Sequence, residues 1–331
     1  MVFSVYDESL TRIGEVSTFL SSTWQEKFCD RGVCQLVVAE SPASVELLKV
    51  GRFIGGTGKS TLWQIKTREK KNREIWCNGY TANYALLNDR VFAGLHKSEN
   101  VEVDLRDAVI NSRPADIVGL SALRGLSGSV TSEHTYPTLF KLAKDLCGSV
   151  DYGFRFIHDR KARRLLFDVY PGDDVPNAKF SPNFGNLSNL ILKASDADFF
   201  NVAYVGGQGQ GEDRTFVECG ATSLSGLYRH EMFVDARDLK QEDGQSTEDY
   251  KAILRQRGLE KLNEKLQVQT ASFEVSPDGF GVVYGLGDRI RCVLQDEGLS
   301  LFARVVEFEE TIEDNRTELE ISVGTPVLQT I

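Results

Sequence analysis

The chain lacks the features that mark membrane-spanning, exported and nucleic-acid-binding proteins. None of its apolar runs reaches the eighteen or so residues that a helix needs to cross a bilayer. The N-terminus runs directly into Val2–Tyr6, without the basic region and apolar core of a signal peptide. Basic residues are outnumbered, since 38 Lys and Arg against 48 Asp and Glu give a net charge of -10. We therefore expect no membrane-spanning segment, no cleaved signal and no specific binding of DNA.

Cysteine and histidine are too scarce and too dispersed to form a metal site or a disulfide framework. No CxxC occurs, and only Cys29 and Cys34 lie near each other in the sequence. The four histidines are equally scattered, so each is interpreted as a surface or hydrogen-bonded side chain. We expect reduced, mostly buried cysteines and neither a metal nor a cofactor. The residues concerned are Cys29, Cys34, Cys77, Cys147, Cys219, Cys292, His96, His134, His158 and His230.

The sequence also lacks a recognisable catalytic constellation. No Gly-x-Ser-x-Gly elbow frames a serine, so nothing marks a hydrolase nucleophile. Glycoside hydrolysis needs two carboxylates that face each other across a cleft. The conspicuous carboxylates are Asp173 and Asp174, which fit a turn, and Glu307, Glu309 and Glu310, which fit the solvated end of a strand. We therefore predict a protein that is not an enzyme.

One short motif invites a different interpretation, because Gly58-Lys59-Ser60-Thr61 is the second half of a phosphate-binding loop. The full motif has a glycine five residues before Gly58, and that position is Phe53, whose side chain blocks the curl of the backbone. A phosphate-binding loop also opens a helix, whereas Thr61–Lys66 alternates in the manner of a strand. We interpret the segment as a hairpin tip with Lys59 in solvent and reject a nucleotide site.

What is present is the composition of a folded, β-rich protein. The 331 residues suffice for two or three domains, and 41% hydrophobic with 26% charged residues is typical of soluble proteins. Leu62–Thr67 and Glu74–Asn78 alternate as two strands joined by a charged turn, Arg68–Arg73. Gly79 is expected to break the second strand before a short helix that ends at Asn88–Val91. The first ninety or so residues thus predict a small barrel or a strongly bent sheet.

The rest of the chain alternates between mixed and β-rich stretches. A helix is predicted from Val103, another over Tyr136–Cys147 with Pro137 at its start, and a third after Ser246, with Gly258 as a weak point inside it. The glycine-rich run Gly206–Gly211 lacks the spacing of a dinucleotide fingerprint and is interpreted as a hairpin loop. The predicted strands in this part are 154–158, 164–170, 190–194, 201–205, 214–219, 229–235, 273–275, 282–284, 289–294, 301–308 and 317–322.

Read together, these landmarks resemble the tail hub family of siphophages and related prophages. Members of that family are similar in fold to the central baseplate hub of contractile-tailed phages and to the N-terminal part of tail-associated lysins. The resemblance spans nearly the whole chain in order. It is carried by Val5-Tyr6-Asp7, Cys77-Asn78-Gly79-Tyr80, Leu87-Asn88-Asp89-Arg90, Phe167-Asp168-Val169-Tyr170-Pro171-Gly172-Asp173, Phe180-Ser181, Asn186-Leu187, Arg229-His230-Glu231 and Leu286-Gly287-Asp288-Arg289-Ile290.

The resemblance implies a structural virion protein at the phage tail tip or baseplate, assembled in the host cytoplasm. Three copies would surround the tail axis, and two barrel-like domains per copy would give a ring of six similar units. That ring would join the six-fold tail tube to three-fold tip components and form part of the DNA-ejection channel. The implied partners are distal tail and tail tube proteins, the tape-measure protein, tip or receptor-binding proteins, and DNA that passes without specific binding.

The resulting fold class is α+β and β-rich, with two small β-barrel-like (tube-type) domains, an α/β insert and a further mixed segment. The predicted segments are an N-terminal barrel over 1–100, the insert over 101–175, strands partly returning to the first barrel over 176–240, and a helix with the C-terminal barrel over 241–331. If the hub interpretation holds, turn residues are candidate assembly contacts or internal structural turns, the internal role being preferred. They are Asp89, Arg90, Gly287, Asp288 and Arg289.

Two alternatives stay open. Some members of the wider family continue into peptidase, lytic or receptor-binding domains, so a tail-associated cell-wall hydrolase or endopeptidase is the first. The second is a host glycan-binding adhesion module, for which Trp24, Trp63, Trp76 and the ten tyrosines would supply stacking surfaces. Because Trp63 and Trp76 lie on opposed strands of one predicted hairpin, we expect them to pack with each other or with the core.

Overall fold

The computed structural model describes most of the chain in two compact units. Unit 1 comprises Met1–Leu190 and Ser272–Ile331, and unit 2 comprises Ile191–Ala271. Each unit has buried apolar residues of its own and is described by itself. The described residues are 1–92, 95–97, 100–112, 115–130, 133–195, 199–241, 244–263, 268–314, 316–324 and 327–330.

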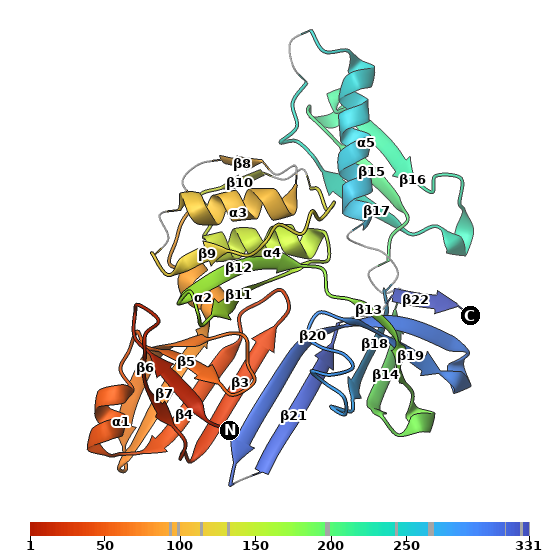
Figure 1. Ribbon diagram of the computed structural model, residues 1–331. Helices are drawn as coiled ribbons and strands as arrows, with labels where there is room; N and C mark the ends of the chain where they lie inside the picture. The colour runs from red at the N-terminus through yellow and green to blue at the C-terminus, as the bar shows by residue number, and fades with distance from the viewer. Residues whose placement is uncertain are drawn as a thin grey trace. The chain divides into compact units, whose positions relative to one another are not determined.

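Unit 1 begins with antiparallel strands that follow one another in the order β3-β4-β7-β6-β5-β1-β2 (Figure 1). Alternate residues of these strands are buried, among them Trp24, Leu36, Ile54 and Ile65, as strand periodicity requires. The short helix α1 (Pro42–Leu47) lies between β4 and β5 and is capped by Ser41. The strands are β1 (Phe3–Tyr6), β2 (Arg12–Val16), β3 (Ser21–Lys27), β4 (Val33–Ala39), β5 (Phe53–Gly56), β6 (Trp63–Lys71) and β7 (Glu74–Thr81).

The hairpin of β6 and β7 is confirmed, but its details differ from the prediction. The turn is only Asn72-Arg73, both with positive φ (54° and 63°), so the charged residues before it belong to a longer strand. Gly79 does not break β7; a Cβ there would meet the carbonyl oxygen of Gln64 at 1.9 Å, so glycine permits close strand contact. Helix α2 (Ala82–Leu87) follows directly.

The insert packs two helices with a three-stranded sheet in the order β11-β12-β9 (Figure 1). Leu105, Leu142, Phe154 and Phe167 belong to its buried core. Helix α4 starts later than predicted, because Thr138 caps it by accepting from the Lys141 N–H, and it runs through Gly148. The elements are β8 (Leu95–Lys97), α3 (Val101–Asn111), β9 (Val118–Leu120), β10 (Glu133–Thr135), α4 (Leu139–Ser149), β11 (Gly153–Asp159) and β12 (Arg164–Tyr170).

The C-terminal part of unit 1 is organised around β20 (Leu299–Glu313), a strand of 15 residues. Its first half pairs with β19 and β22, and its second half pairs with β3 and β21. The predicted strand at 282–284 is wrong, since these residues form a turn in which Phe280 bridges Tyr284. The other elements are β13 (Asp174–Phe180), η1 (Pro182–Phe184), β19 (Arg289–Leu294), η4 (Gln295–Glu297), β21 (Arg316–Val323) and β22 (Val327–Thr330). The strands β14 (Leu187–Ser195) and β18 (Val268–Val275) each have residues in both units.

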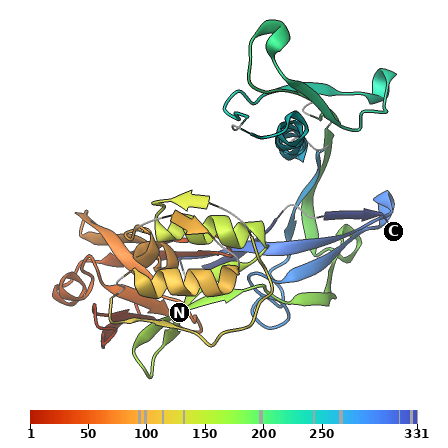
Figure 2. The same cartoon turned by 90° about the horizontal axis from the view of Figure 1, so that it is seen from above.

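Unit 2 is a three-stranded sheet, in the order β16-β15-β17, with α5 on one face (Figure 2). Ala203, Val205, Val217 and Leu254 belong to its core. Gly258 was predicted to be a weak point inside α5, but a Cβ there would meet the Cys219 Sγ at 2.4 Å, so its small size allows the close packing. The elements are β15 (Val202–Gly206), η2 (Gly211–Asp213), β16 (Phe216–Gly220), η3 (Gly226–Tyr228), β17 (Glu231–Asp235) and α5 (Thr247–Asn263).

The β-rich α+β class predicted from the sequence is therefore confirmed. Helix α5 shares its core with β15–β17 in unit 2. The division into four segments stays a prediction. Within the described residues, no helix has the length and apolar character needed to span a bilayer.

Candidate functional site

The predicted turn Gly287–Arg289 lies at the start of β19 and is held by the side chain of Asp288. One carboxylate oxygen of Asp288 accepts from the Asp173 N–H at 2.9 Å, and the other accepts from the Gly285 N–H at 2.7 Å. The Asp288 carbonyl oxygen accepts from the Val305 N–H at 2.8 Å. The Asp288 contacts thus connect the residue before β13, the turn at Gly285–Asp288 and β20.

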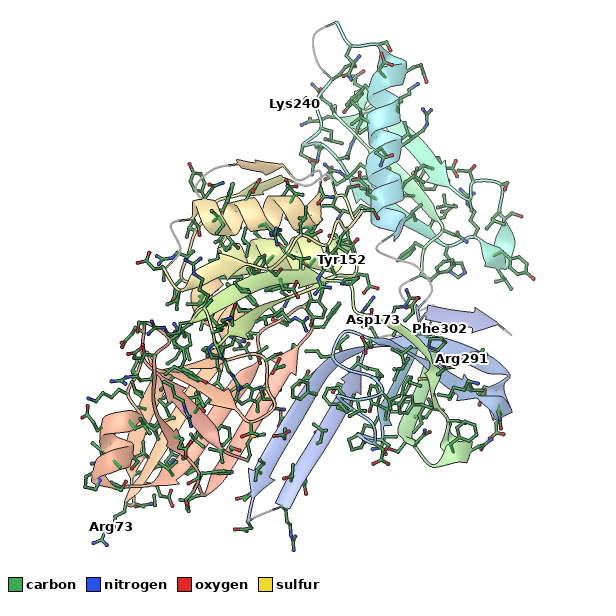
Figure 3. All side chains as sticks on the ribbon, viewed as in Figure 1. Arg73, Tyr152, Asp173, Lys240, Arg291 and Phe302 are labelled. Carbon is green, nitrogen blue, oxygen red and sulfur yellow. The ribbon has the colours of Figure 1, made fainter. Side chains whose placement is uncertain are left out.

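Two glycines make this close approach possible. Gly172 and Gly287 have φ angles of +68° and +94°, a region that side chains disfavour. A Cβ on Gly172 would lie 1.8 Å from the Gly287 carbonyl oxygen, and a Cβ on Gly287 would lie 2.6 Å from the ring of Phe28. The two turns, far apart in the sequence, therefore touch through their backbones. Figure 3 labels Asp173, which follows Gly172 and precedes β13.

Arg304, on β20, completes this arrangement. Its guanidinium donates to the Pro171 carbonyl oxygen at 2.6 Å, to the Gly287 carbonyl oxygen, and to the Asp151 carboxylate with one bond of 2.8 Å. It also lies over the Phe28 ring, 4.7 Å from the centroid, and only 11% of its side chain is exposed. We call the contacts of Arg304 with Asp151, Pro171 and Gly287 the Arg304 joint.

The sequence did not single out Arg304, because it stands in an alternating strand pattern with no motif around it. The only available signal was that Pro171 and Gly287 both lie in segments that carry the family resemblance.

The other candidate residues are not brought into this joint. Arg289 places its Nε 3.4 Å from an Asp174 carboxylate oxygen, in a largely exposed pair. Asp89 pairs with Lys66 at 3.1 Å, and the carbonyl oxygen of Arg90 accepts from the Leu139 N–H at the start of α4. An assembly role for these residues stays a prediction.

The insert contains a buried carboxylate that the sequence did not mark as a site. Asp168 is 1% exposed and accepts two hydrogen bonds from Arg124 at 3.0 Å, one from Arg155 at 3.1 Å and one from Ser121 at 3.0 Å. Burial acts to raise the pKa of Asp168, but the bonds from Arg124 and Ser121 and the charge of Arg155 hold it below its usual value. A carboxylate so fully paired serves as a structural anchor and not as an acid or base.

The Gly58–Thr61 segment differs from its prediction in one respect. Lys59 does not lie in solvent; its Nζ is 3.1 Å from a Glu310 carboxylate oxygen, and both side chains are 15% exposed. The Nζ also lies 4.6 Å from the centroid of the Phe308 ring. Glu310, predicted to be solvated, is therefore mostly buried. The strand β6 begins at Trp63 and no helix follows the segment, as the alternating pattern predicted.

A cavity of about 430 Å³ adjoins this ion pair in unit 1. Its charged lining residues are already bound, since Lys27 pairs with Glu307 at 2.9 Å and Glu26 accepts from the Thr61 hydroxyl at 2.6 Å. The charged groups that line the cavity are therefore engaged by partners within the chain.

The tryptophans do not form a glycan-stacking surface as a set. Trp24 and Trp63 are 1% exposed and belong to the core. Trp76 is opposite Glu69 and Trp63 is opposite Thr81, so the two do not pair across the hairpin. The indole N–H of Trp76 donates to the Glu74 carboxylate at 2.9 Å. The Lys71 ammonium lies 3.9 Å from the centroid of the Trp76 ring. The prediction that Trp63 packs in the core is confirmed, whereas mutual packing with Trp76 is wrong.

The cysteines match the prediction, since all six are free and Cys29 alone is not fully buried. Burial raises the pKa of both Cys29 and Cys292 to about 12, so neither thiol is poised as a nucleophile. Within the described residues, no three His, Cys, Asp or Glu side chains are placed to hold a metal ion.

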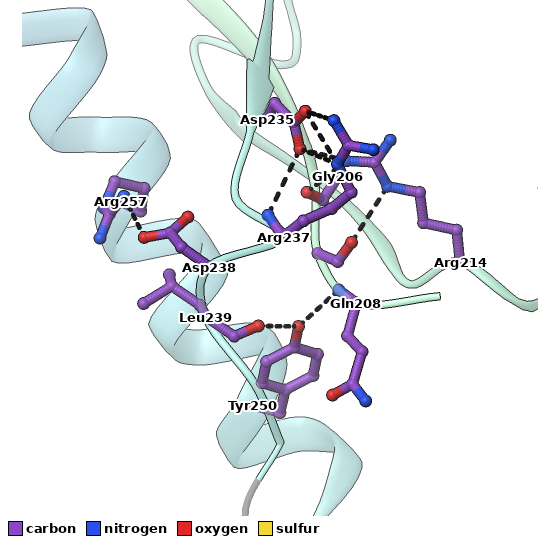
Figure 4. A network of polar contacts seen from close by, with 10 residues as sticks. Gly206, Gln208, Arg214, Asp235, Arg237, Asp238, Leu239, Tyr250 and Arg257 are labelled. Atoms are coloured by element: carbon purple, nitrogen blue, oxygen red, sulfur yellow. Dashed lines mark hydrogen bonds and ion pairs between the residues drawn. The ribbon is translucent and has the colours of Figure 1, made fainter. Parts of the chain in front are cut away.

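The glycine-rich turn of unit 2 is closed by a local polar network (Figure 4). Arg214 donates to the carbonyl oxygens of Gly206 at 2.8 Å and Gly207 at 3.0 Å, and it pairs with Asp235 at 2.7 Å. The Tyr250 hydroxyl donates to the Leu239 carbonyl oxygen and accepts from the Gln208 N–H, both at 2.7 Å. These bonds fix the start of the loop against α5.

A family model and several solved structures match this chain. The model of a family described as Siphovirus ReqiPepy6 Gp37-like protein matches residues 71–325. No curated protein matches the sequence.

Solved structures of tail and baseplate proteins share the fold. The tail protein from Neisseria meningitidis MC58 is 14% identical with a TM-score of 0.55, over 97% of this chain and 95% of that one. The 43 kDa tail protein of prophage MuSo2 from Shewanella oneidensis is 10% identical with a TM-score of 0.56, over 98% of both chains. A chain of the p2 virion baseplate in its activated conformation is 9% identical with a TM-score of 0.56, over 97% of this chain and 98% of that one. The family model thus covers most of the chain, and the fold is one that tail and baseplate proteins share.

Proposed function

The chain belongs to the family of Siphovirus ReqiPepy6 Gp37-like proteins, and we propose on that premise that it is the hub of a siphophage tail tip. The observation that carries the proposal is the extent of the shared fold: three tail or baseplate chains match over 97% to 98% of this chain. The correspondence therefore covers both units and is not confined to one common motif.

In this proposal three copies form a ring that joins the six-fold tail tube to three-fold tip components. Strand β20 supports such a building block, because it pairs with β3 of the N-terminal part and with β19, β21 and β22 of the C-terminal part. One continuous strand thus links two β-rich regions. A part that joins a six-fold tube to three-fold tip components needs such a rigid link.

The hub contributes part of the DNA-ejection channel, and its partners are distal tail, tape-measure and tip proteins. The net charge of -10 supports a passage role, since a surface with excess acid repels phosphate and would not retain the DNA. The mature location is the virion, after assembly in the host cytoplasm. The chain acts without catalysis, with its polar groups arranged for structure.

Electron cryomicroscopy of particles that carry an affinity-tagged chain tests the proposal. We expect three copies around the tail axis, next to the last ring of the tail tube. Particles that lack the chain, or contain it away from the axis, would contradict the hub assignment. A cell-wall digestion assay with the purified chain is expected to release no soluble fragments, and release would favour a tail-associated hydrolase instead.

A further inference from the structure

Unit 1 has a surface groove of about 360 Å³ in which every charged lining residue is an arginine. The groove lies between the loop that joins β1 to β2 and the turn that joins β11 to β12. Arg12 comes from the start of β2, and Arg160 and Arg163 come from the turn. We call this surface the arginine groove. Its remaining lining residues are neutral, and three of them carry a hydroxyl group: Ser4, Tyr6, Leu10 and Thr11.

The chain itself engages these guanidinium groups only in part. Arg163 donates to the Thr11 hydroxyl at 3.1 Å, and Arg12 pairs with Glu15, where both side chains are about half exposed. Arg160 forms no ion pair in the part of the chain that the structure describes. Because the planar fork of a guanidinium group matches a carboxylate with two hydrogen bonds, the groove is suited to acidic side chains from outside.

Both loops that border the groove are held in place by aspartate side chains. The Asp7 carboxylate accepts from two backbone N–H groups of the first loop, both at 2.9 Å. The Asp159 carboxylate accepts from two backbone N–H groups of the turn, at 3.0 and 2.9 Å. Leu10 and Arg163 have φ angles of +59° and +52°, which a side chain adopts only where the surrounding structure enforces it. The arginines are therefore positioned before a ligand arrives, which lowers the entropic cost of binding.

The basic surface is limited in extent, and this argues against nucleic acid as the ligand. A neighbouring depression shares Arg163 with the groove but is also lined by Asp7, Glu8 and Asp116. A DNA backbone carries a charge at every phosphate, so it would meet these carboxylates beside the arginines. The net charge of -10 opposes it further. The groove therefore matches a compact group of carboxylates and not an extended polyanion.

The chain presents such a group at the tip of the hairpin formed by β20 and β21 (Figure 1). Glu313, Asp314 and Glu318 are exposed, and none of them forms an ion pair within the described residues. Arg316 stands opposite Glu313 in the ladder, so the carboxylates of this tip still outnumber its basic side chains. A groove of this size receives side chains and not a whole element, and the end of a hairpin offers them.

Repulsion along this hairpin favours a basic partner. Glu309 lies directly opposite Glu320, and like charges in that position destabilise a pair of strands. Gln25 donates to Glu309 at 2.8 Å, but Glu320 is exposed and has no ion pair in the described part of the chain. Guanidinium groups that approach the tip would relieve this repulsion.

We propose that the arginine groove binds the β20–β21 tip of a second copy of this chain. Within one copy the two surfaces are separate, since Glu313 stands opposite Ser21 at the start of β3, whereas the groove lies at Arg12. Because the groove and the tip are different surfaces, each copy offers its tip to one neighbour and its groove to the other. Such a head-to-tail contact closes into a ring. The inference rests on the proposed function for the number of copies in that ring.

Charge exchange in a complementation assay tests the inference. Arg160→Glu with Arg163→Glu places acid in the groove, and Glu313→Arg with Asp314→Arg places base on the tip. Each pair of changes is expected to lower the yield of infectious particles at least about tenfold, because like charges then face each other. A chain with all four changes restores the attraction with reversed signs, so its yield should return to within about threefold of the unaltered chain.

Arg73→Glu is the matched control, because Arg73 is also an exposed arginine at a hairpin tip, with a φ of +63°. Alone it should leave the yield unchanged. Combined with Glu313→Arg and Asp314→Arg it should fail to restore the yield. A four-change chain that stays as defective as either two-change chain, or two-change chains with full yield, would overturn the inference.

Zero-length cross-linking of unaltered particles gives a second measurement that does not depend on how a variant folds. A carbodiimide joins the exposed Lys161, which lies beside the groove in the sequence, to a carboxylate in contact with it. In particles assembled from isotopically light and heavy chains, we expect peptides that join Lys161 to Glu313, Asp314 or Glu318 and carry both isotopes. Links from Lys161 only to a different virion protein, or none in particles that contain the chain, would overturn the inference and leave the hub assignment standing. Particles that lack the chain would overturn the hub assignment and this inference with it.

Discussion

Arg304 in unit 1 and Arg229 in unit 2 bind similar groups over very different sequence distances. Arg304 reaches Asp151 and Pro171, which are 153 and 133 residues away. Arg229 reaches the carbonyl oxygens of Thr222 and Leu224, only 7 and 5 residues away, and its farthest side-chain partner, Tyr204, is 25 residues away. The same guanidinium chemistry therefore closes a long loop in one unit and stiffens a short one in the other.

This difference indicates what each arginine contributes. A contact between distant segments forms only in the folded topology, so its loss lowers the free energy of unfolding of unit 1. A contact within one loop mainly fixes a surface conformation, so its loss changes local order and binding more than global stability. The following predictions test that distinction, from the largest expected effect to the smallest.

Gly172→Ala should be the most damaging change. The added methyl group would overlap the Gly287 carbonyl oxygen, and the φ of +68° disfavours any side chain, so the two turns must separate. We expect a loss of about 4 kcal/mol or more in the free energy of unfolding, measured by urea denaturation. The control is Gly185→Ala, which has the same φ but open space around its Cβ position, and should cost only about 1 kcal/mol. Equal effects would show that the contact between the turns is unimportant.

Arg304→Ala should be next. It removes charge-assisted bonds to Asp151, Pro171 and Gly287, and we expect a loss of about 3 kcal/mol in the same measurement. Arg289→Ala is the matched control, because its ion pair with Asp174 is largely exposed and should contribute less than about 0.5 kcal/mol. If both variants unfold at the same denaturant concentration, the Arg304 joint does not hold unit 1 together.

Asp288→Ala should cost about 2 kcal/mol, because it leaves the N–H groups of Asp173 and Gly285 without their acceptor. Asp288→Asn retains one oxygen acceptor, so its free energy of unfolding should fall by about half as much as that of Asp288→Ala. We also expect Asp288→Ala to impair particle assembly in a complementation assay. Normal particle formation by a destabilised variant would separate the turn's internal role from assembly.

The pH dependence of unfolding should reveal His158. Burial lowers its pKa to about 4, from an ordinary value of 6.5. Its buried Nε2 has no hydrogen-bond partner in the part of the chain that the structure describes. Between these values the unfolded chain binds the proton more readily, so stability falls as the pH drops from about 6.5 towards 4. We expect an effect of about 1 kcal/mol, because the ring is only half-buried. His158→Phe should flatten this slope, and an unchanged slope would assign it to other groups.

Arg229→Ala should have the smallest effect on the global transition. We expect an unchanged urea midpoint but several-fold faster proteolysis within residues 222–229, because the carbonyl oxygens of Thr222 and Leu224 lose their donor. Arg237→Ala is the control, since its side chain is 65% exposed and pairs only locally with Asp235. A large shift of the urea midpoint for Arg229→Ala would show that Arg229, like Arg304, contributes to global stability.

Local pattern predicted much of the fold. The hairpin of β11 and β12, helix α3 and the strand β19 follow from alternation, apolar spacing and turn chemistry, each of which lies within one short segment. The same reasoning mistook 282–284 for a strand, because Val282 and Val283 have strand propensity yet lie in a glycine-rich turn with Val282 91% exposed.

The candidate site was predictable only in part. Asp288 could be recognised as a turn residue, and Asp173 as part of another turn, but nothing local indicates that the two turns meet. Lys59 was assigned to solvent because glycine flanks it, whereas Glu310, its partner, lies 251 residues away. Arg304 and Asp168 stand in ordinary strand patterns, and their roles arise from partners that tertiary folding supplies.

Strand β20 has a mechanical consequence. Along Leu299–Glu313 it is flanked by β19 and β22 in its first half and by β3 and β21 in its second. A pulling force along this strand loads its backbone hydrogen bonds in shear, so many must rupture together and not one after another. Under such a load, β20 would transmit force from one β-rich region to the other without stretching.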